Sequence, residues 1–158
     1  SPGAPVLQNV TLNHVTAFPA SHLFIIGDYL GTTSQMKNFV FTNSILNAGL
    51  YPIWSTGGGA TNCAASDSPL IAFNACFSSY TFSANAIVAT PPAHPPAKWP
   101  AKNFFPEAVG AVRFVNYNGG KSGDYHLQLS SPYEGKAIDG KDLGADVDAV
   151  NSATAGVE

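Results

Sequence analysis

Short segments in which apolar and polar residues alternate recur three times along the chain. They span residues 10–16, 39–46 and 80–88. A period of two is typical of a β-strand that buries one face. Each segment also carries an asparagine followed, two residues later, by a β-branched residue: Asn13 and Val15, Asn43 and Ile45, Asn85 and Ile87. The recurrence of one strand pattern after unequal insertions predicts one structural turn repeated several times.

This repeat favours an all-β solenoid in which equivalent strands stack and loops of different length project from the turns. The asparagines fall where each strand ends, and asparagine tolerates the left-handed backbone that a bend requires. Stacked asparagines would form a ladder of amide hydrogen bonds. The alternative interpretation is three unrelated strands of a β-sandwich that share turn chemistry.

The order of segments predicts a single domain with two long insertions. Glycine and proline together number 27, which is typical of a loop-rich β protein. We expect a short helical turn between Asp67 and Phe77, because Ser68-Pro69 reads as a helix start. The expected divisions are a lead-in at 1–5, the repeated coils with insertions at 55–77 and 90–106 over 6–129, and a closing segment at 130–158.

The two cysteines, Cys63 and Cys76, lie in the first insertion, and we predict that they form a disulfide. The alternative is a pair of buried free thiols, since cysteine is often simply a core residue. A disulfide implies an oxidising compartment. Together with only 11% charged residues, it predicts a secreted or cell-surface protein.

Charge and hydropathy exclude two classes of partner. Only seven residues are basic and the net charge is −3, so we expect no nucleic-acid partner. The longest apolar runs are far too short to span a bilayer. The chain starts at Ser1 and not at an initiator methionine, so we expect a processed product or a portion of a longer protein.

The last third of the chain resembles a known family. The runs that carry this resemblance are Phe114-Val115-Asn116, Gly123 to Leu127, Ser131-Pro132 and Asp139 to Asp146. They are similar to the final coil and closing segment of bacterial secreted right-handed parallel β-helix proteins of the pectate-lyase-like superfamily. The resemblance implies a right-handed parallel β-helix of few coils, in which this chain corresponds to the C-terminal end. It also implies a link to polysaccharides, because the superfamily includes pectate and alginate lyases as well as non-catalytic surface proteins.

Candidate catalytic residues are few. His14, His22 and Asp28 fall in or beside the first repeat and could flank one groove, and Arg113 is the only arginine that could act as the base of a lyase. The alternative for Arg113 is a solvated exterior side chain, because its neighbours are apolar and face inward. The sequence contains no adjacent pair of aspartates, so it does not favour a glycosidase of the polygalacturonase kind.

Metal binding has one candidate. Asp142, Asp146 and Asp148 form the only acidic cluster and could bind Ca²⁺ through carboxylates. Helix caps and turns explain the same residues. We expect no other cofactor.

Aromatic residues in or beside loops suggest contact with sugars. Sugars stack their C–H faces on aromatic rings while their hydroxyl groups stay in water. Tyr51, Trp54 and Trp99 are the candidates for such ligand binding. The alternative is that these rings pack the insertions onto the body of the protein.

The leading functional hypothesis is a secreted carbohydrate-associated module without a complete catalytic site. One alternative is the C-terminal part of a polysaccharide lyase. Another is a structural subunit that self-associates through its N-terminal face, because the first strands would leave backbone groups unpaired. That face would meet either a second copy or missing upstream coils.

Overall fold

A computed structural model describes residues 7–26, 36–55, 62–65 and 68–156. The elements in chain order are β1 (Gln8–Asn13), β2 (Thr16–Ala17), β3 (Phe24–Ile26), β4 (Lys37–Thr42), β5 (Ile45–Asn47), β6 (Ile53–Ser55), α1 (Pro69–Cys76), β7 (Tyr80–Ser83), β8 (Ala86–Val88), η3 (Pro96–Lys98), η4 (Val109–Val112), β9 (Phe114–Asn116), η5 (Asn118–Gly120), β10 (Asp124–Leu127) and α2 (Val147–Thr154). In this part of the chain, neither α-helix is long and apolar enough to cross a membrane.

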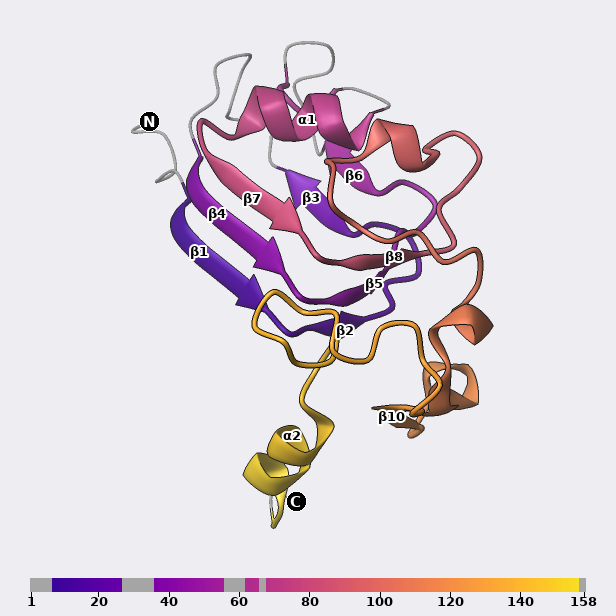
Figure 1. Ribbon diagram of the computed structural model, residues 1–158. Coiled ribbons are helices and arrows are strands. Elements are labelled where there is room, and N and C mark those ends of the chain that lie inside the picture. Colours follow the sequence, from indigo (N-terminus) through magenta and orange to yellow (C-terminus); the bar gives the residue numbers. More distant parts are fainter. Residues whose placement is uncertain (1–6, 27–35, 56–61, 66–67, 157–158) are drawn as a thin grey trace.

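The three repeated segments lie side by side as parallel strands, as their sequence similarity predicts. β1, β4 and β7 form one sheet, and β2, β5 and β8 form a second (Figure 1). β3 and β6 form a third, two-stranded sheet. The register of the first sheet aligns Leu12 with Phe41 and Phe41 with Phe82. Residues of like character therefore meet across the strands and form a continuous apolar inner face.

The predicted all-β, right-handed parallel β-helix is wrong. The strands are only two to six residues long and form separate small sheets, and the pairing of β9 with β10 is antiparallel. With α1 and α2, the described residues make a mixed α/β arrangement and no closed or solenoid sheet. Alternation reports one buried face over a few residues, and it does not determine how strands join into larger sheets. The β-sandwich alternative also fails, because the sheets built from the repeats are parallel.

Aromatic residues dominate the main core. Phe39, Phe41 and Phe82 of the first sheet are 3–5% exposed, and Phe73 of α1 packs among them. The rings of Phe73 and Phe82 have centroids 4.9 Å apart. Each buried phenylalanine contributes about 1.5–3 kcal/mol through its removal from water. α1 thus completes the core with its inward-facing ring.

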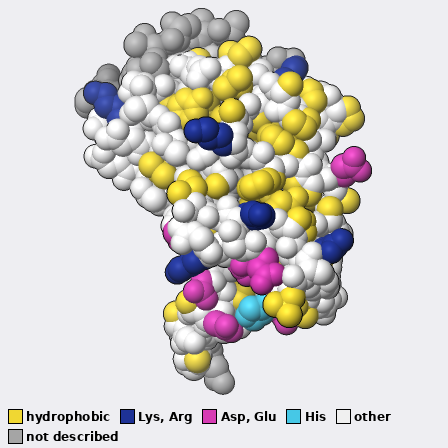
Figure 2. All heavy atoms as spheres, viewed as in Figure 1, with side chains coloured by type: hydrophobic (Ala, Val, Ile, Leu, Met, Phe, Trp, Pro, Cys, Tyr) yellow, Lys and Arg dark blue, Asp and Glu magenta, His cyan; other side chains and the backbone are white. Residues whose placement is uncertain are grey.

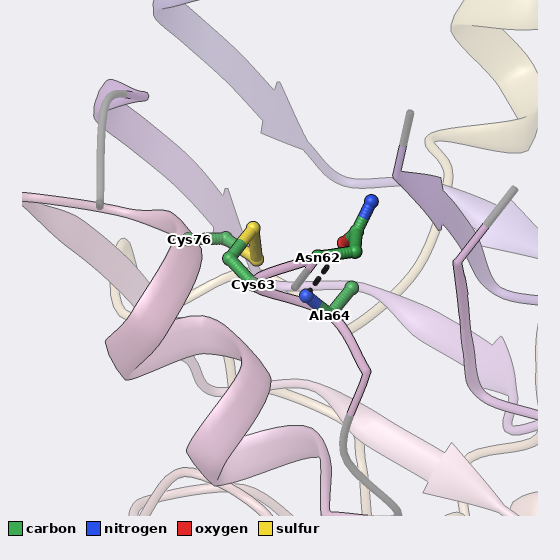
Figure 3. Close-up of a disulfide and its surroundings, with 4 residues drawn as sticks. All are labelled: Asn62, Cys63, Ala64 and Cys76. Carbon is green, nitrogen blue, oxygen red and sulfur yellow. Dashed lines mark hydrogen bonds between the residues drawn. A yellow bond between two sulfur atoms is a disulfide. The ribbon is translucent and has the colours of Figure 1, made fainter. Parts of the chain in front are cut away.

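The predicted disulfide between Cys63 and Cys76 is present and ties the segment before α1, inside the first insertion, to the last residue of α1 (Figure 3). The predicted helical segment is also confirmed. Ser68 caps α1 by accepting a hydrogen bond from the Ile71 N–H, and Pro69 occupies the first helical turn, where its missing N–H costs nothing. The disulfide and the cap therefore fix both ends of one short helix.

The asparagine ladder forms only in part. Asn43 Nδ2 donates to Asn13 Oδ1 at 2.9 Å, but Asn85 pairs with Asn103 instead, at 3.1 Å. The register places Ile45 opposite Ala86, so Asn85 lies beside Ser44 and not beside Asn43, and the Ser44 N–H donates to Asn85 Oδ1 at 3.1 Å. In each later layer, the repeated asparagine is therefore displaced by one residue relative to the asparagine of the layer before it. The left-handed bend that follows each strand lies at His14, Asn43 and Ala84, whose φ angles are 53°, 56° and 53°.

Two later segments cover parts of the stacked strands. Residues 102–106 run along the outer edge of β8, where the Ile87 N–H donates to the Phe104 carbonyl at 2.8 Å. The closing segment instead packs on the bend after β4, where the Gly144 N–H donates to the Asn43 carbonyl at 2.9 Å. A Cβ at Gly144 would lie 2.6 Å from Thr16 Oγ1, so only glycine allows this approach.

Candidate functional site

Three ring-bearing side chains form a cluster on the surface of the β3–β6 sheet. We define His22, Tyr51 and Trp54 as the aromatic platform. Tyr51 is 46% exposed and Trp54 is 42% exposed. In the described part of the chain, these two are the only aromatic residues among the exposed large hydrophobic side chains. Most other aromatic rings serve the core, so the platform is the exception.

The three rings are in mutual contact. His22 stacks on Trp54 with centroids 5.0 Å apart and an interplanar angle of 28°. Tyr51 meets Trp54 edge to face at 5.2 Å. His22 and Tyr51 are 6.1 Å apart. Such pairs are worth about 0.5–1.5 kcal/mol each beyond their burial, so the rings hold one another in place.

The backbone beneath the platform is fixed by pairing between two successive passes of the chain. Trp54 lies opposite Ile25 in the β3–β6 register. The Tyr51 N–H donates to the Ser21 carbonyl at 3.0 Å, and His22 Nδ1 donates back to the Tyr51 carbonyl at 3.2 Å. Pro52 is buried just before β6, and its carbonyl accepts from two N–H groups of the facing segment. Pro52 has no N–H for strand pairing, and β6 begins only after it, at Ile53.

One glycine makes this pairing possible. Gly49 has a φ angle of +71°, and a Cβ there would lie 2.5 Å from the Ser21 carbonyl oxygen. Only glycine adopts this angle without strain and leaves room for the close approach. Gly49 is therefore a positioning residue for Tyr51, two residues farther on.

The two described segments that carry the platform, residues 21–26 and 49–55, are largely apolar. Leu50 and Ile25, each 61% exposed, lie next to platform residues in the sequence or the strand register. Residues 21–26 and 49–55 contain no lysine, arginine, aspartate or glutamate. Such a surface offers flat ring faces to a ligand and little electrostatic selection by charge.

Trp99 does not belong to this surface. It is 3% exposed, and its indole N–H donates to the His94 carbonyl at 3.1 Å. Its ring stacks on Phe82 with centroids 6.1 Å apart. Trp99 thus follows the packing alternative, in which it holds the proline-rich segment on the core, and it has no free face for a sugar.

The structure does not bring together the catalytic candidates that it describes. His14 Nε2 contacts Asp139 at 3.0 Å, whereas His22 belongs to the aromatic platform. Arg113 is exposed, has a left-handed φ angle of 61° and donates to the Ser130 carbonyl at 2.7 Å. No contact among the described residues joins these groups. Asp28 lies outside the described residues.

The three tail aspartates have separate local roles. Asp142 accepts from the Gly135 N–H at 2.8 Å. Asp146 caps α2 through the Ala149 N–H at 2.9 Å. Asp148 contacts His126 Nε2 at 3.2 Å. Asp142 and Asp146 thus serve a turn and a helix cap. Within the part of the chain that the structure describes, no three His, Cys, Asp or Glu residues are grouped so that they could hold a metal ion.

Sequence reasoning missed a charged cluster in which His126 bridges Asp124 and Asp148. The hydrogen bond with Asp124 raises the pKa of His126 and lowers the pKa of that carboxyl. In Figure 2, acidic side chains gather with a histidine at the end of the molecule that holds α2. A cavity of about 640 Å³ between β10 and α2 adjoins the cluster. The spacing of Asp124 and His126 contained the signal, since residues two apart on a strand share a face.

The hydrogen bond between His14 and Asp139 likewise lowers the pKa of the Asp139 carboxyl.

Comparisons with protein-family models, curated proteins and solved structures find no match to this chain. The resemblance to the pectate-lyase-like superfamily therefore stays a prediction.

Proposed function

We propose that this protein binds a neutral polysaccharide through the aromatic platform. The observation that carries the proposal is the contact between two exposed aromatic rings, Tyr51 and Trp54, at a centroid distance of 5.2 Å. Apolar C–H faces of pyranose rings bury well against such rings, while their hydroxyl groups keep their hydrogen bonds to water.

The lack of charged residues in the two described segments that carry the platform supports a neutral ligand over an acidic one. A polymer of uronic acids carries a carboxylate on each sugar, and its recognition calls for lysine or arginine nearby. Residues 21–26 and 49–55 provide neither. The net charge of −3 would also repel a polyanion.

We further propose that the protein acts in an oxidising, extracellular setting, where a polysaccharide would be met. The disulfide Cys63–Cys76 supports this location. Arg113, the candidate base of a lyase, donates to the Ser130 carbonyl and takes no part in the aromatic platform, so we favour a carbohydrate-binding module over the lyase alternative.

The test is a binding titration with neutral plant and microbial polysaccharides, with polygalacturonate as the acidic comparison. Replacing Trp54 with alanine should weaken binding about tenfold or more, because about 1.4 kcal/mol of ring contact is lost. Tyr51→Ala should have a smaller effect in the same direction. Leu129→Ala is the matched control, since Leu129 is 91% exposed and lies outside the platform.

Two results would contradict the proposal. One is binding that Trp54→Ala leaves unchanged. The other is a preference for polygalacturonate over every neutral polymer, particularly if ultraviolet absorbance reports unsaturated products, which would favour the lyase alternative.

A further inference from the structure

The first layer of strands is much more exposed than the layers stacked on it. Leu12 of β1 is 37% exposed, whereas Phe41 and Phe82, which follow it in the sheet register, are 4% and 3% exposed. In the second sheet, Ala17 of β2 is partly exposed, while its partner Leu46 is fully buried. The inner face of the first layer thus lacks the cover that each later layer receives.

The backbone of β1 is also open along one side. The His14 N–H donates to the Thr42 carbonyl at 3.3 Å, so β1 uses its β4 side for pairing. Parallel strands direct the N–H and C=O groups of alternate residues to opposite sides, which turns those of Thr11 and Asn13 to the free side. Among the described residues, β4 is the only strand that pairs with β1.

Two side-chain ladders end at this edge with unused donors. In the first, Ser79 Oγ donates to Asn38 Oδ1 at 3.0 Å, and Asn38 Nδ2 donates to Asn9 Oδ1 at 2.7 Å. In the second, Asn43 Nδ2 donates to Asn13 Oδ1 at 2.9 Å. Within the described chain, the Nδ2 groups of Asn9 and Asn13 donate to no further residue. Each ladder is therefore ready to continue into one more strand.

β1 itself carries none of the charged residues that usually prevent strand pairing, although Asp139 contacts His14, directly after the strand, at 3.0 Å. Edge strands are commonly protected by lysine, proline or inward-pointing charges. The first 27 residues contain no lysine, arginine, aspartate or glutamate, and β1 itself is free of proline. The strand itself therefore meets an identical strand without repulsion between its own side chains.

The opposite end of the stack is closed, which limits how copies can meet. The Ala84 N–H donates to the Lys102 carbonyl at 2.7 Å, and Asn103 Nδ2 donates to the Phe82 carbonyl at 3.0 Å. The outer edge of β8 and the C-terminal end of β7 are thus occupied, which disfavours head-to-tail stacking of copies. Two copies can still pair symmetrically through the open edge of β1, and two-fold contacts of this kind are the commonest in homo-oligomers.

We propose that β1 is a self-association edge, at which β1 of a second copy adds antiparallel around a two-fold axis near Thr11. In this register, Asn9 of one copy lies opposite Asn13 of the other. The free amide of Asn13 then reaches the unused lone pair on Asn9 Oδ1, so both ladders continue across the axis. Main-chain hydrogen bonds supply the pairing, as in other cases of strand addition.

The test is sedimentation velocity of the full chain from micromolar to millimolar concentration. We expect a reversible monomer–dimer equilibrium. Thr11→Lys and Thr11→Glu should each give monomers, because like charges then face one another at the axis. A mixture of the two variants should restore the dimer, which only pairing close to Thr11 explains. Thr81→Lys is the matched control, since Thr81 is exposed on β7 in the same register and should leave the dimer intact.

Hydrogen exchange of the wild-type protein tests the same edge without relying on a variant that could fold poorly. The Thr11 amide of the wild-type protein should become protected as concentration rises. Three results would overturn the proposal. The protein could be monomeric at all concentrations, both Thr11 variants could retain the dimer, or the Thr11 amide could be equally protected at the lowest concentration. The last outcome would mean that the chain's own residues cover the edge.

Discussion

Replacing Asn85 with alanine should destabilise the protein far more than the same change at Asn13. Both asparagines belong to the repeated sequence pattern, but their surroundings differ. Asn85 is fully buried, accepts from the Ser44 N–H at 3.1 Å and donates to the Phe41 carbonyl at 2.9 Å. Asn13 is exposed, and water can replace its partners.

The expected magnitudes follow from these contacts. Asn85→Ala leaves the buried N–H of Ser44 without an acceptor, which costs about 1–3 kcal/mol, and removes a donor from the Phe41 carbonyl. The total is about 2–4 kcal/mol. Asn13→Ala removes bonds at the surface and should cost about 0.5–1.5 kcal/mol.

Urea unfolding followed by circular dichroism gives both free energies of unfolding, and an unchanged m-value shows that the comparison is valid. Equal losses for the two variants, or a larger loss for Asn13→Ala, would refute the reasoning. That result would mean that Asn85 does not connect the second and third layers as described.

Three further changes have defined outcomes. Gly49→Ala should cost about 1–3 kcal/mol in thermal unfolding, because its Cβ would lie 2.5 Å from the Ser21 carbonyl oxygen at a φ angle of +71°; full stability would contradict the contact. Cys76→Ser should lower the free energy of unfolding in urea by about 3 kcal/mol. A reductant should lower the free energy of unfolding of the wild-type protein by the same amount and leave that of the variant unchanged. The raised pKa of His126 means that its charged contact with Asp148 is complete below its ordinary pKa of 6.5 and is lost as pH rises through the raised value. Hydrogen exchange in α2 should therefore accelerate with pH beyond its intrinsic rate, and Asp148→Asn should remove that excess and lower the pKa of His126 in an NMR titration.

Local features of the fold could be predicted from the sequence where one residue type has a dominant physical role. Alternation identified the strands that became β1, β4 and β7. Pro69 after a serine marked the start of α1, and two cysteines in one insertion marked the disulfide. Each of these features depends on neighbours close in sequence, which a single chain displays directly.

Longer-range features could not be predicted in the same way. The register aligns Asn13 with Thr42, so matching asparagine to asparagine misplaced each layer by one residue. The antiparallel pairing of β9 with β10 was also missed. Short strands carry little sequence information about their partners, because pairing and sheet size depend on tertiary contacts.

The candidate site was predicted in part. Tyr51 and Trp54 proved to be exposed neighbours, whereas Trp99 proved to be a core residue. Nothing in the composition of the surrounding loops separates these cases. Trp99 differs from Tyr51 and Trp54 because the segment that carries it folds over the core and buries its ring. Such burial depends on tertiary contacts.

The central claim is that the aromatic platform binds a sugar polymer, and the indole N–H signals of the two tryptophans test it most directly. The chain contains only Trp54 and Trp99, so an NMR spectrum should show two indole signals that Trp54→Phe assigns. On titration with a neutral polysaccharide, we predict that the Trp54 signal shifts with saturation while the Trp99 signal stays in place. A titration in which Trp54 does not move with any polysaccharide would contradict the account.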